Sequence, residues 1–264
     1  METRIRGRNS VLGKRILLSL VLLSLVGAPI RAQDSVPAKA ITARTANTTL
    51  PPEWTYSLRP YFFLSGMSGS VTVEPLTFPV NSSFAYLLEN VKVGAFISFT
   101  ATKENWGVYA DFQYINLYGE SEGGLGYSLD LKNVIGEVDL VYRPTAAPTL
   151  GFLVGIRTYG VGQTVTLVGR ELPEATTTVV DPILGGYGTW ELHDSWDFEL
   201  RGDIGGFGVS SESTYQMMAV FRWGLTPTLS VPIGYRVLGY QIQKDDVLMN
   251  TRMMGLVVGL DIQF

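Results

Sequence analysis

Alternation of apolar and polar residues with a period of two runs through most of this chain and is clearest near its C-terminal end. From Met254 to Phe264 every even-numbered position is apolar, whereas the odd-numbered positions are mostly small or polar, as Gly255 and Asp261 illustrate. Side chains alternate between the two faces of a β-strand. This segment therefore predicts a strand with one continuous apolar face and one polar face.

Segments of this kind follow one another from Trp54 onward, separated by turn residues. Each is long enough to supply the roughly 9–11 residues that a tilted strand needs to cross a bilayer. The segments lie near residues 54–67, 91–103, 106–119, 127–143, 150–167, 178–192, 196–208, 213–224, 229–243 and 250–264. The pattern predicts an all-β fold, a transmembrane antiparallel up-and-down β-barrel of about ten strands. Eight or twelve strands are the alternatives, because the segments around 127–143 and 168–180 alternate imperfectly.

The composition agrees with a membrane barrel. Charged residues make up 17% of the chain, against about 25% in a typical soluble domain. Beyond the N-terminal region no run approaches the ~20 apolar residues of a membrane helix. The chain has no cysteine, which excludes disulfides, thiolate metal sites and a lipid-anchored cysteine.

The first 32 residues predict a secretory signal peptide. Basic residues between Arg4 and Arg15 precede an apolar stretch from Ile16 to Ile30, and cleavage is expected after Ala32. An uncleaved membrane anchor is the alternative, but the apolar stretch is short for a membrane helix.

The remaining chain divides into two parts. Residues 33–52 are polar and bounded by prolines, which predicts a flexible periplasmic leader, and residues 53–264 form the barrel domain. The whole chain has 20 basic and 24 acidic residues, of which residues 1–32 hold six and one, so the mature chain carries 14 and 23 and a net charge of −9. This acidic balance argues against nucleic acid as a partner.

The connections between the segments fall into two classes. Short ones lie at 103–105, 144–149, 193–195 and 225–228, and mostly longer polar ones at 68–90, 119–126, 168–177 and 244–249. Outer-membrane barrels have short periplasmic turns and longer outer loops, although the short connection at 209–212 breaks this trend. In the first long loop, residues 83–89 are expected to form one or two helical turns.

The polar faces of the strands carry most of the charge. On these strand assignments the lumen holds Arg59, Asp111, Glu137, Asp139, Arg157, Asp181, Glu191, Asp197, Glu199, Arg201, Asp203, Arg222, Arg236 and Asp261. Buried charges must be paired, so we favour a network of ion pairs that fills a narrow interior. A polar pathway for small solutes is the alternative, but ten strands leave little more room than the eight that side chains just fill.

Aromatic residues gather where the segments meet the short turns. All five tryptophans lie at or near this end, namely Trp54, Trp106, Trp190, Trp196 and Trp223. Rings with an apolar body and a polar edge favour the headgroup boundary of a membrane. We therefore expect these tryptophans to lie at the membrane interface.

The closing residues Asp261-Ile262-Gln263-Phe264 resemble the C-terminal strand of bacterial outer-membrane proteins. Residues 181–186 and 196–208 are similar to a group of uncharacterised outer-membrane barrel proteins, and this resemblance covers roughly residues 54–264. It implies a location in the bacterial outer membrane, lipid and lipopolysaccharide as surroundings, and Phe264 as the mark that the barrel-assembly machinery recognises. It implies no defined activity.

The sequence offers little for catalysis. His193 is the only histidine and lies in a predicted short turn. A Ser–His–acid site needs a serine and a carboxylate that converge on the ring, whereas the side chains of Asp194 and Ser195 diverge in a tight turn. We expect no enzyme activity, no cofactor and no metal.

Three functional hypotheses remain. The first is an integral outer-membrane barrel of structural, adhesive or small-solute channel type with a charged, largely filled lumen. The second is an outer-membrane barrel enzyme that hydrolyses lipid or peptide. The third is a secreted lipocalin-like binding barrel, which keeps its apolar face inside and therefore needs a charged exterior that this sequence lacks.

Overall fold

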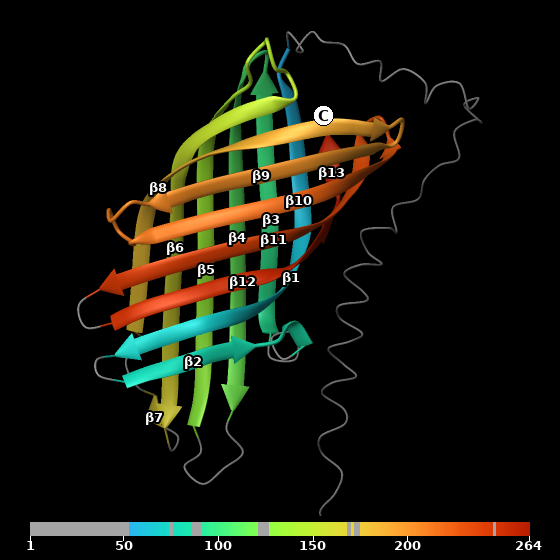
Figure 1. Ribbon diagram of the computed structural model, residues 1–264. Coiled ribbons are helices and arrows are strands. Elements are labelled where there is room, and N and C mark those ends of the chain that lie inside the picture. Colours follow the sequence, from blue (N-terminus) through green and yellow to red (C-terminus); the bar gives the residue numbers. More distant parts are fainter. Residues whose placement is uncertain are drawn as a thin grey trace, which may run out of the picture. The chain divides into compact units, whose positions relative to one another are not determined.

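The computed structural model describes residues 53–73, 76–85, 91–120, 127–167, 170–171, 175–244 and 247–264. The predicted signal peptide and leader lie outside these described residues. The described residues all belong to one compact unit, and they form a closed antiparallel β-barrel (Figure 1). None of the described residues belongs to a helix long and apolar enough to span a membrane.

Ten strands make up the wall of the barrel, the last of them divided at Leu260. They are β1 (Thr55–Val73), β3 (Val91–Lys103), β4 (Trp106–Glu120), β5 (Tyr127–Tyr142), β6 (Leu150–Leu167), β8 (Ala175–His193), β9 (Trp196–Gly206), β10 (Ser213–Thr226), β11 (Leu229–Lys244), and β12 (Val247–Gly259) with β13 (Asp261–Gln263). Each strand pairs with its neighbour in sequence. The prediction of an up-and-down barrel of about ten strands is confirmed.

The barrel closes where its last strand meets its first. β1 pairs with β3 on one side and with β12 and β13 on the other. At the end of this seam Tyr56 and Phe264 exchange two backbone hydrogen bonds of 3.0 Å each. The rings of the two residues also stack, with centroids 5.9 Å apart. Closure leaves no strand edge unpaired along this seam, as a membrane barrel requires.

Strand β1 is longer than the sequence predicted. It continues to Val73 and pairs with β2 (Leu76–Ser82), so a hairpin occupies much of the segment expected to be a loop. Of the predicted helical turns at 83–89, Phe84 and Ala85 are helical and residues 86–89 lie outside the described residues. A second short strand, β7 (Arg170–Glu171), pairs with β6.

The two ends of the barrel differ. At one end, which we call the short-turn end, only two residues separate the paired positions Lys103 and Trp106, and likewise Thr226 and Leu229. At the other end, the loop end, strands stop at different heights: β9 has 11 residues, whereas its neighbour β8 has 19. The predicted short turns at 103–105 and 225–228 lie at the short-turn end. The prediction of a longer connection at 244–249 is wrong, because Lys244 pairs with Val247 and only two residues separate them at the loop end.

Alternation along the strands separates the two surfaces of the wall. Large apolar side chains are exposed on the outer surface, among them Phe152, Leu184, Met217, Ile233 and Leu256. Charged side chains lie buried on the inner surface. An apolar exterior around a charged interior suits a wall that faces lipid, and it is the reverse of a lipocalin-like soluble barrel.

The register of the closing seam can be tested by cross-linking, because the chain has no native cysteine. Met67 pairs with Met253, and the parity of the seam makes this a non-hydrogen-bonded pair, with Cα atoms about 4.5 Å apart, within disulfide range. We expect the double variant Met67→Cys/Met253→Cys to form a disulfide on mild oxidation, measured as a reducible shift on a gel.

The matched control is Met67→Cys/Met254→Cys. Met254 is one residue away and faces the opposite surface of the wall, so it should not cross-link. Cross-linking of the control instead of the first pair would mean that the seam is shifted by one residue.

Candidate functional site

The lumen holds nearly all the charges that the sequence placed there. Nine side chains are buried: Asp111, Glu137, Asp139, Arg157, Asp181, Arg201, Asp203, Arg236 and Asp261. Arg59, Glu199, Arg222 and Asp197 are partly buried. Glu191 is exposed instead, because it lies at the short-turn rim of β8, where the wall no longer encloses it.

Arg157 of β6 is fully buried near the middle of the lumen. Its Nε donates to Glu137 of β5 at 2.6 Å, and its Nη2 donates to Asp203 of β9 at 2.7 Å. The guanidinium therefore bridges carboxylates from two strands that are not neighbours in the wall. Two charge-assisted bonds of this kind hold its orientation.

Arg201 of β9 binds the same carboxylates from the other side. Its guanidinium donates to Glu137, to Asp139 at 2.9 Å and to Asp203 at 3.0 Å. It also lies over the ring of Tyr109, 4.7 Å from the centroid. Every carboxylate of this group thus contacts at least one arginine.

Two inward glycines leave room for this group. A Cβ on Gly155 would lie 2.1 Å from Asp139 Oδ1 and 2.3 Å from the Val138 carbonyl oxygen. A Cβ on Gly185 would lie 2.6 Å from the Cβ of Asp203. Contacts this short do not occur in folded proteins, so both positions need glycine for a close approach of backbone and side chain.

Arg236 of β11 extends the network to the opposite wall. Its guanidinium donates to Asp111 at 3.1 Å, to the Tyr61 hydroxyl at 3.1 Å and to Gln216 at 2.7 Å. Gln216 in turn donates to Asp203 at 3.1 Å. We call the connected set the central charge network; its members are Tyr61, Asp111, Glu137, Asp139, Arg157, Arg201, Asp203, Gln216 and Arg236.

A second group of charges lies nearer the short-turn end. Arg59 contacts Asp261 at 3.0 Å and Glu199 at 3.6 Å, and Arg222 contacts Glu199 and, at 3.3 Å, Asp261. Ser57 also donates to Asp261. Two arginines and two carboxylates therefore neutralise one another there.

An apolar layer fills the lumen on the loop side of the charges. Its buried members are Tyr61, Phe63, Ile135, Tyr159, Val179, Leu238, Tyr240, Ile242, Met253 and Val257. Tyr61 belongs to both sets, because its hydroxyl bonds to the charges while its ring packs in the layer. On each strand these residues lie farther from the short turns than the charge on that strand, as Tyr159 does after Arg157. The rings of Tyr159 and Tyr240 stack 4.5 Å apart. We call this set the loop-side apolar layer.

Sequence reasoning missed this layer, although a signal was present. In β11 the inward positions Leu238, Tyr240 and Ile242 follow Arg236, so the inner face changes from charged to apolar along the strand. On the other face, Gly239, Gln241 and Gln243 replace the apolar residues that precede them. This reversal of the alternation along β11 was the available sign.

Asp181 lies opposite Arg157 in the pairing of β8 with β6, but its carboxylate bonds to Ser211. Its carboxylate accepts hydrogen bonds from the Ser211 backbone N–H at 2.8 Å and from the Ser211 hydroxyl at 2.5 Å. Both residues are buried. Asp181 therefore fastens the connection between β9 and β10 to strand β8.

The predicted interface aromatics lie at the short-turn end. Trp54, Trp106, Trp196 and Trp223 are exposed, and Trp190 is half-buried. Trp196 and Trp223 stack with centroids 6.0 Å apart, and Trp190 stacks with Phe198. Phe264 is exposed at the same end.

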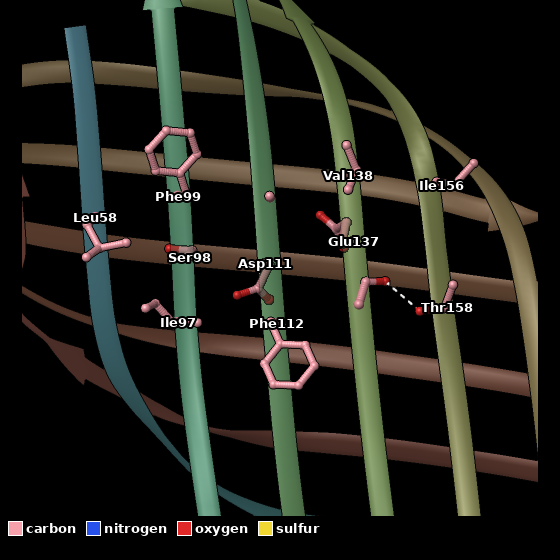
Figure 2. Close-up of a pocket in the computed structure, with 12 residues that line it drawn as sticks. Leu58, Ile97, Ser98, Phe99, Asp111, Phe112, Glu137, Val138, Ile156 and Thr158 are labelled. Carbon is pink, nitrogen blue, oxygen red and sulfur yellow. Dashed lines mark hydrogen bonds between the residues drawn. The ribbon is translucent and has the colours of Figure 1, made fainter.

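The outer wall has a shallow hollow of about 420 Å³ across β1, β3, β4, β5 and β6. Figure 2 shows Leu58, Phe99 and Phe112 among the residues around it. The small outward residues Ala110 and Gly136 leave the space, and Thr158 donates to the Gly136 carbonyl oxygen at 3.2 Å. The walls of this hollow are mostly apolar, which suits a surface that faces lipid.

A metal site needs several ligand side chains close together, which can be examined in the part of the chain that the structure describes. No group of three or more histidine or acidic residues there is arranged to hold a metal ion. His193 is exposed at the last position of β8, where it pairs with Trp196 of β9.

No described protein family matches the sequence, and no curated protein is detectably similar to it. Solved structures are similar in fold. The outer-membrane protease OmpT from Escherichia coli has a TM-score of 0.47 at 9% identity, covering 82% of this chain and 98% of that one. The attachment invasion locus protein Ail of Yersinia pestis gives 0.38 at 10% identity, covering 80% and 98%. The translocator domain of the autotransporter NalP from Neisseria meningitidis gives 0.40 at 9%, covering 97% and 98%.

Arg157 provides the test of the central charge network. The variant Arg157→Met leaves Glu137 and Asp203 with one fewer buried cation, so we expect it to lower the free energy of unfolding by about 3–5 kcal/mol. Urea titration of the barrel in lipid vesicles measures this loss.

Arg222→Met is the matched control. Arg222 is partly exposed, so water compensates its carboxylate partners and the loss should be clearly smaller. Adding Glu137→Gln and Asp203→Asn to Arg157→Met should restore part of the stability. Equal losses for the two arginines would contradict the assignment of Arg157 to a buried network.

Proposed function

We propose that this chain is an integral outer-membrane barrel whose lumen does not conduct, and that it serves as a structural and adhesive scaffold exposed at the cell surface. This proposal rests on the observation that two sets of side chains fill the lumen. A charge network and an apolar layer lie one above the other, and both consist of buried side chains.

The central charge network opposes conduction because its groups are committed to one another. A pore for polar solutes needs polar groups that face water, whereas Arg157, Glu137 and Asp203 are fully or almost fully buried and mutually bonded. The loop-side apolar layer adds a second barrier, because an ion that crossed it would lose its hydration.

The strands that extend beyond the bilayer support a role at the surface. A tilted strand needs roughly 9–11 residues to cross the hydrocarbon, and β6 and β8 have 18 and 19. The surplus residues project past the membrane at the loop end. Projecting sheet offers a surface to partners outside the cell.

Catalysis is not part of the proposal. The enzyme hypothesis needs a base with a nucleophile or a water to activate, and His193 is exposed at the short-turn end, away from the projecting strands. The surroundings that we propose are membrane lipid and lipopolysaccharide along the apolar wall, and the barrel-assembly machinery during insertion through Phe264.

Conductance tests the proposal. We expect the purified barrel in planar bilayers to produce no discrete current steps at moderate voltage, because both layers block the lumen. Heat-modifiability on a gel verifies that the reconstituted protein is folded. Reproducible current steps of constant size would support the small-solute channel instead and contradict the proposal.

A further inference from the structure

Over its first residues, strand β8 is paired with a neighbouring strand on one side only. β6 pairs with β8 over the whole segment from Ala175 to Gly188, but the pairing of β9 with β8 begins only at Ile183. Among the described strands, none therefore pairs with residues 175–182 on the β9 side. Figure 1 shows β8 continuing past the end of β9. We call this stretch the β8 edge.

The lengths of the two strands place this edge outside the hydrocarbon. β9 has 11 residues, about what a tilted strand needs to cross the bilayer. An open sheet edge inside the hydrocarbon would leave backbone groups unsatisfied at several kcal/mol each, so such edges do not occur there. The part of the edge with open backbone groups, residues 175–179, therefore projects beyond the membrane.

At the end of the edge nearest the short turns, the connection between β9 and β10 covers β8. Pro182 has no N–H to offer a neighbouring strand, and pairing with β9 stops beside it. The Val180 N–H donates to the Ser210 hydroxyl at 3.2 Å, and Ser211 bonds to Asp181. These contacts satisfy the edge as far as Val180.

Thr176 and Thr178, which lie nearer the loop end, present backbone groups on the side of β8 that β9 does not cover. The Val180 N–H points away from β6, whereas the Thr189 N–H bonds to the Thr149 carbonyl oxygen on the β6 side. N–H groups alternate in direction along a strand. The N–H and C=O groups of Thr176 and Thr178 therefore point to the open side, as Val180 does.

From Ala175 to Val180 the β8 edge lacks the usual protection against strand pairing, whereas Asp181 and Pro182 protect its other end. Exposed edges are normally blunted by charged side chains, prolines or bulges. From Ala175 to Val180 the sequence is Ala-Thr-Thr-Thr-Val-Val, with no charge and high β-propensity. The edge is thus suited to accept another strand.

We propose that the β8 edge binds an extended peptide segment of a partner outside the cell, by adding it as a strand antiparallel to β8. The added strand continues the sheet in the place that β9 vacates. This inference rests on the proposed role as a surface-exposed scaffold. Backbone bonds to Thr176 and Thr178 supply the recognition, as in other cases of strand addition.

A second copy of this chain does not fit the edge. Copies inserted in the same direction are related by rotation about the membrane normal, and their β8 strands tilt by about 35–45° each. The two strands would therefore cross instead of running side by side, and a continuous ladder of backbone bonds would not form. The occupant is instead a segment free to align with β8.

The alternation of β8 sets the side chains that the peptide needs. Val179 is buried in the loop-side apolar layer, whereas Thr176 and Thr178 are exposed on the outer surface. An added strand keeps this alternation. We therefore expect apolar residues at every second position of the peptide and polar residues between them.

Amide hydrogen exchange of the folded barrel tests whether the edge is open. The amides of Thr176 and Thr178 should exchange at least about a hundredfold faster than those of Thr177 and Val179, which bond to β6. Residue-resolved NMR in detergent micelles measures the rates. Equal protection of Thr177 and Thr178 would mean that another segment already covers the edge, and would overturn this inference. It would not affect the proposal that the lumen does not conduct.

A synthetic peptide of alternating threonine and valine, with a lysine at each end, tests binding. We expect it to slow exchange at Thr178, and N-methylation of the peptide nitrogens that face β8 to weaken binding by at least about tenfold. Methylation of the intervening nitrogens should have little effect. Absence of protection at Thr178 by the unmodified peptide at millimolar concentration would overturn the proposal.

Variants at one position separate backbone recognition from side-chain contact. Thr178→Pro removes the N–H on the open side and should abolish binding, whereas Thr178→Ala keeps the N–H and should preserve it. Heat-modifiability on a gel verifies that both variants fold. If Thr178→Pro does not fold, the methylated peptides distinguish backbone recognition from side-chain contact. Equal binding by the two folded variants would contradict strand addition at this edge.

Discussion

The structure depends on enclosing ionised side chains within a wall whose outer surface is apolar. A buried charge without partners is too costly to keep, so each must meet an opposite charge or hydrogen-bond donors, as Asp181 meets Ser211. Arg157 does this by joining Glu137 of β5 to Asp203 of β9. The same bonds that neutralise the carboxylates also tie opposite parts of the wall together, so the charge network has a structural role in the barrel.

Filling of the lumen and projection of the strands follow from the same geometry. A ring of ten strands encloses little more space than side chains fill, and here charges occupy one level and aromatic and aliphatic residues the next. Binding is therefore confined to the ends of the barrel. Strands of unequal length make the loop end uneven, and the early end of β9 leaves the β8 edge without a neighbour.

Sequence alternation was enough to predict the ten strands and the face of most residues, because side-chain direction has a period of two in any strand. It could not predict which acid pairs with Arg157, since Asp203 lies 46 positions away and meets it only across the lumen. It also missed the loop-side apolar layer, because the alternation of β11 reverses beyond Arg236 and places Leu238 and Tyr240 on the inner face. The β1–β2 hairpin was missed although Val71, Val73, Leu76, Phe78 and Val80 alternate, because Pro75 and Pro79 disfavour a strand.

Labelling from within the bilayer tests the central claim most directly. A carbene precursor dissolved in the hydrocarbon, activated by light and mapped by mass spectrometry, reports which side chains meet lipid. The account predicts label on Leu256, Ile233 and Leu184, and none on the inward residues Val257 and Leu238. Label on Val257 and Leu238, with Leu256 and Ile233 unmodified, would contradict it.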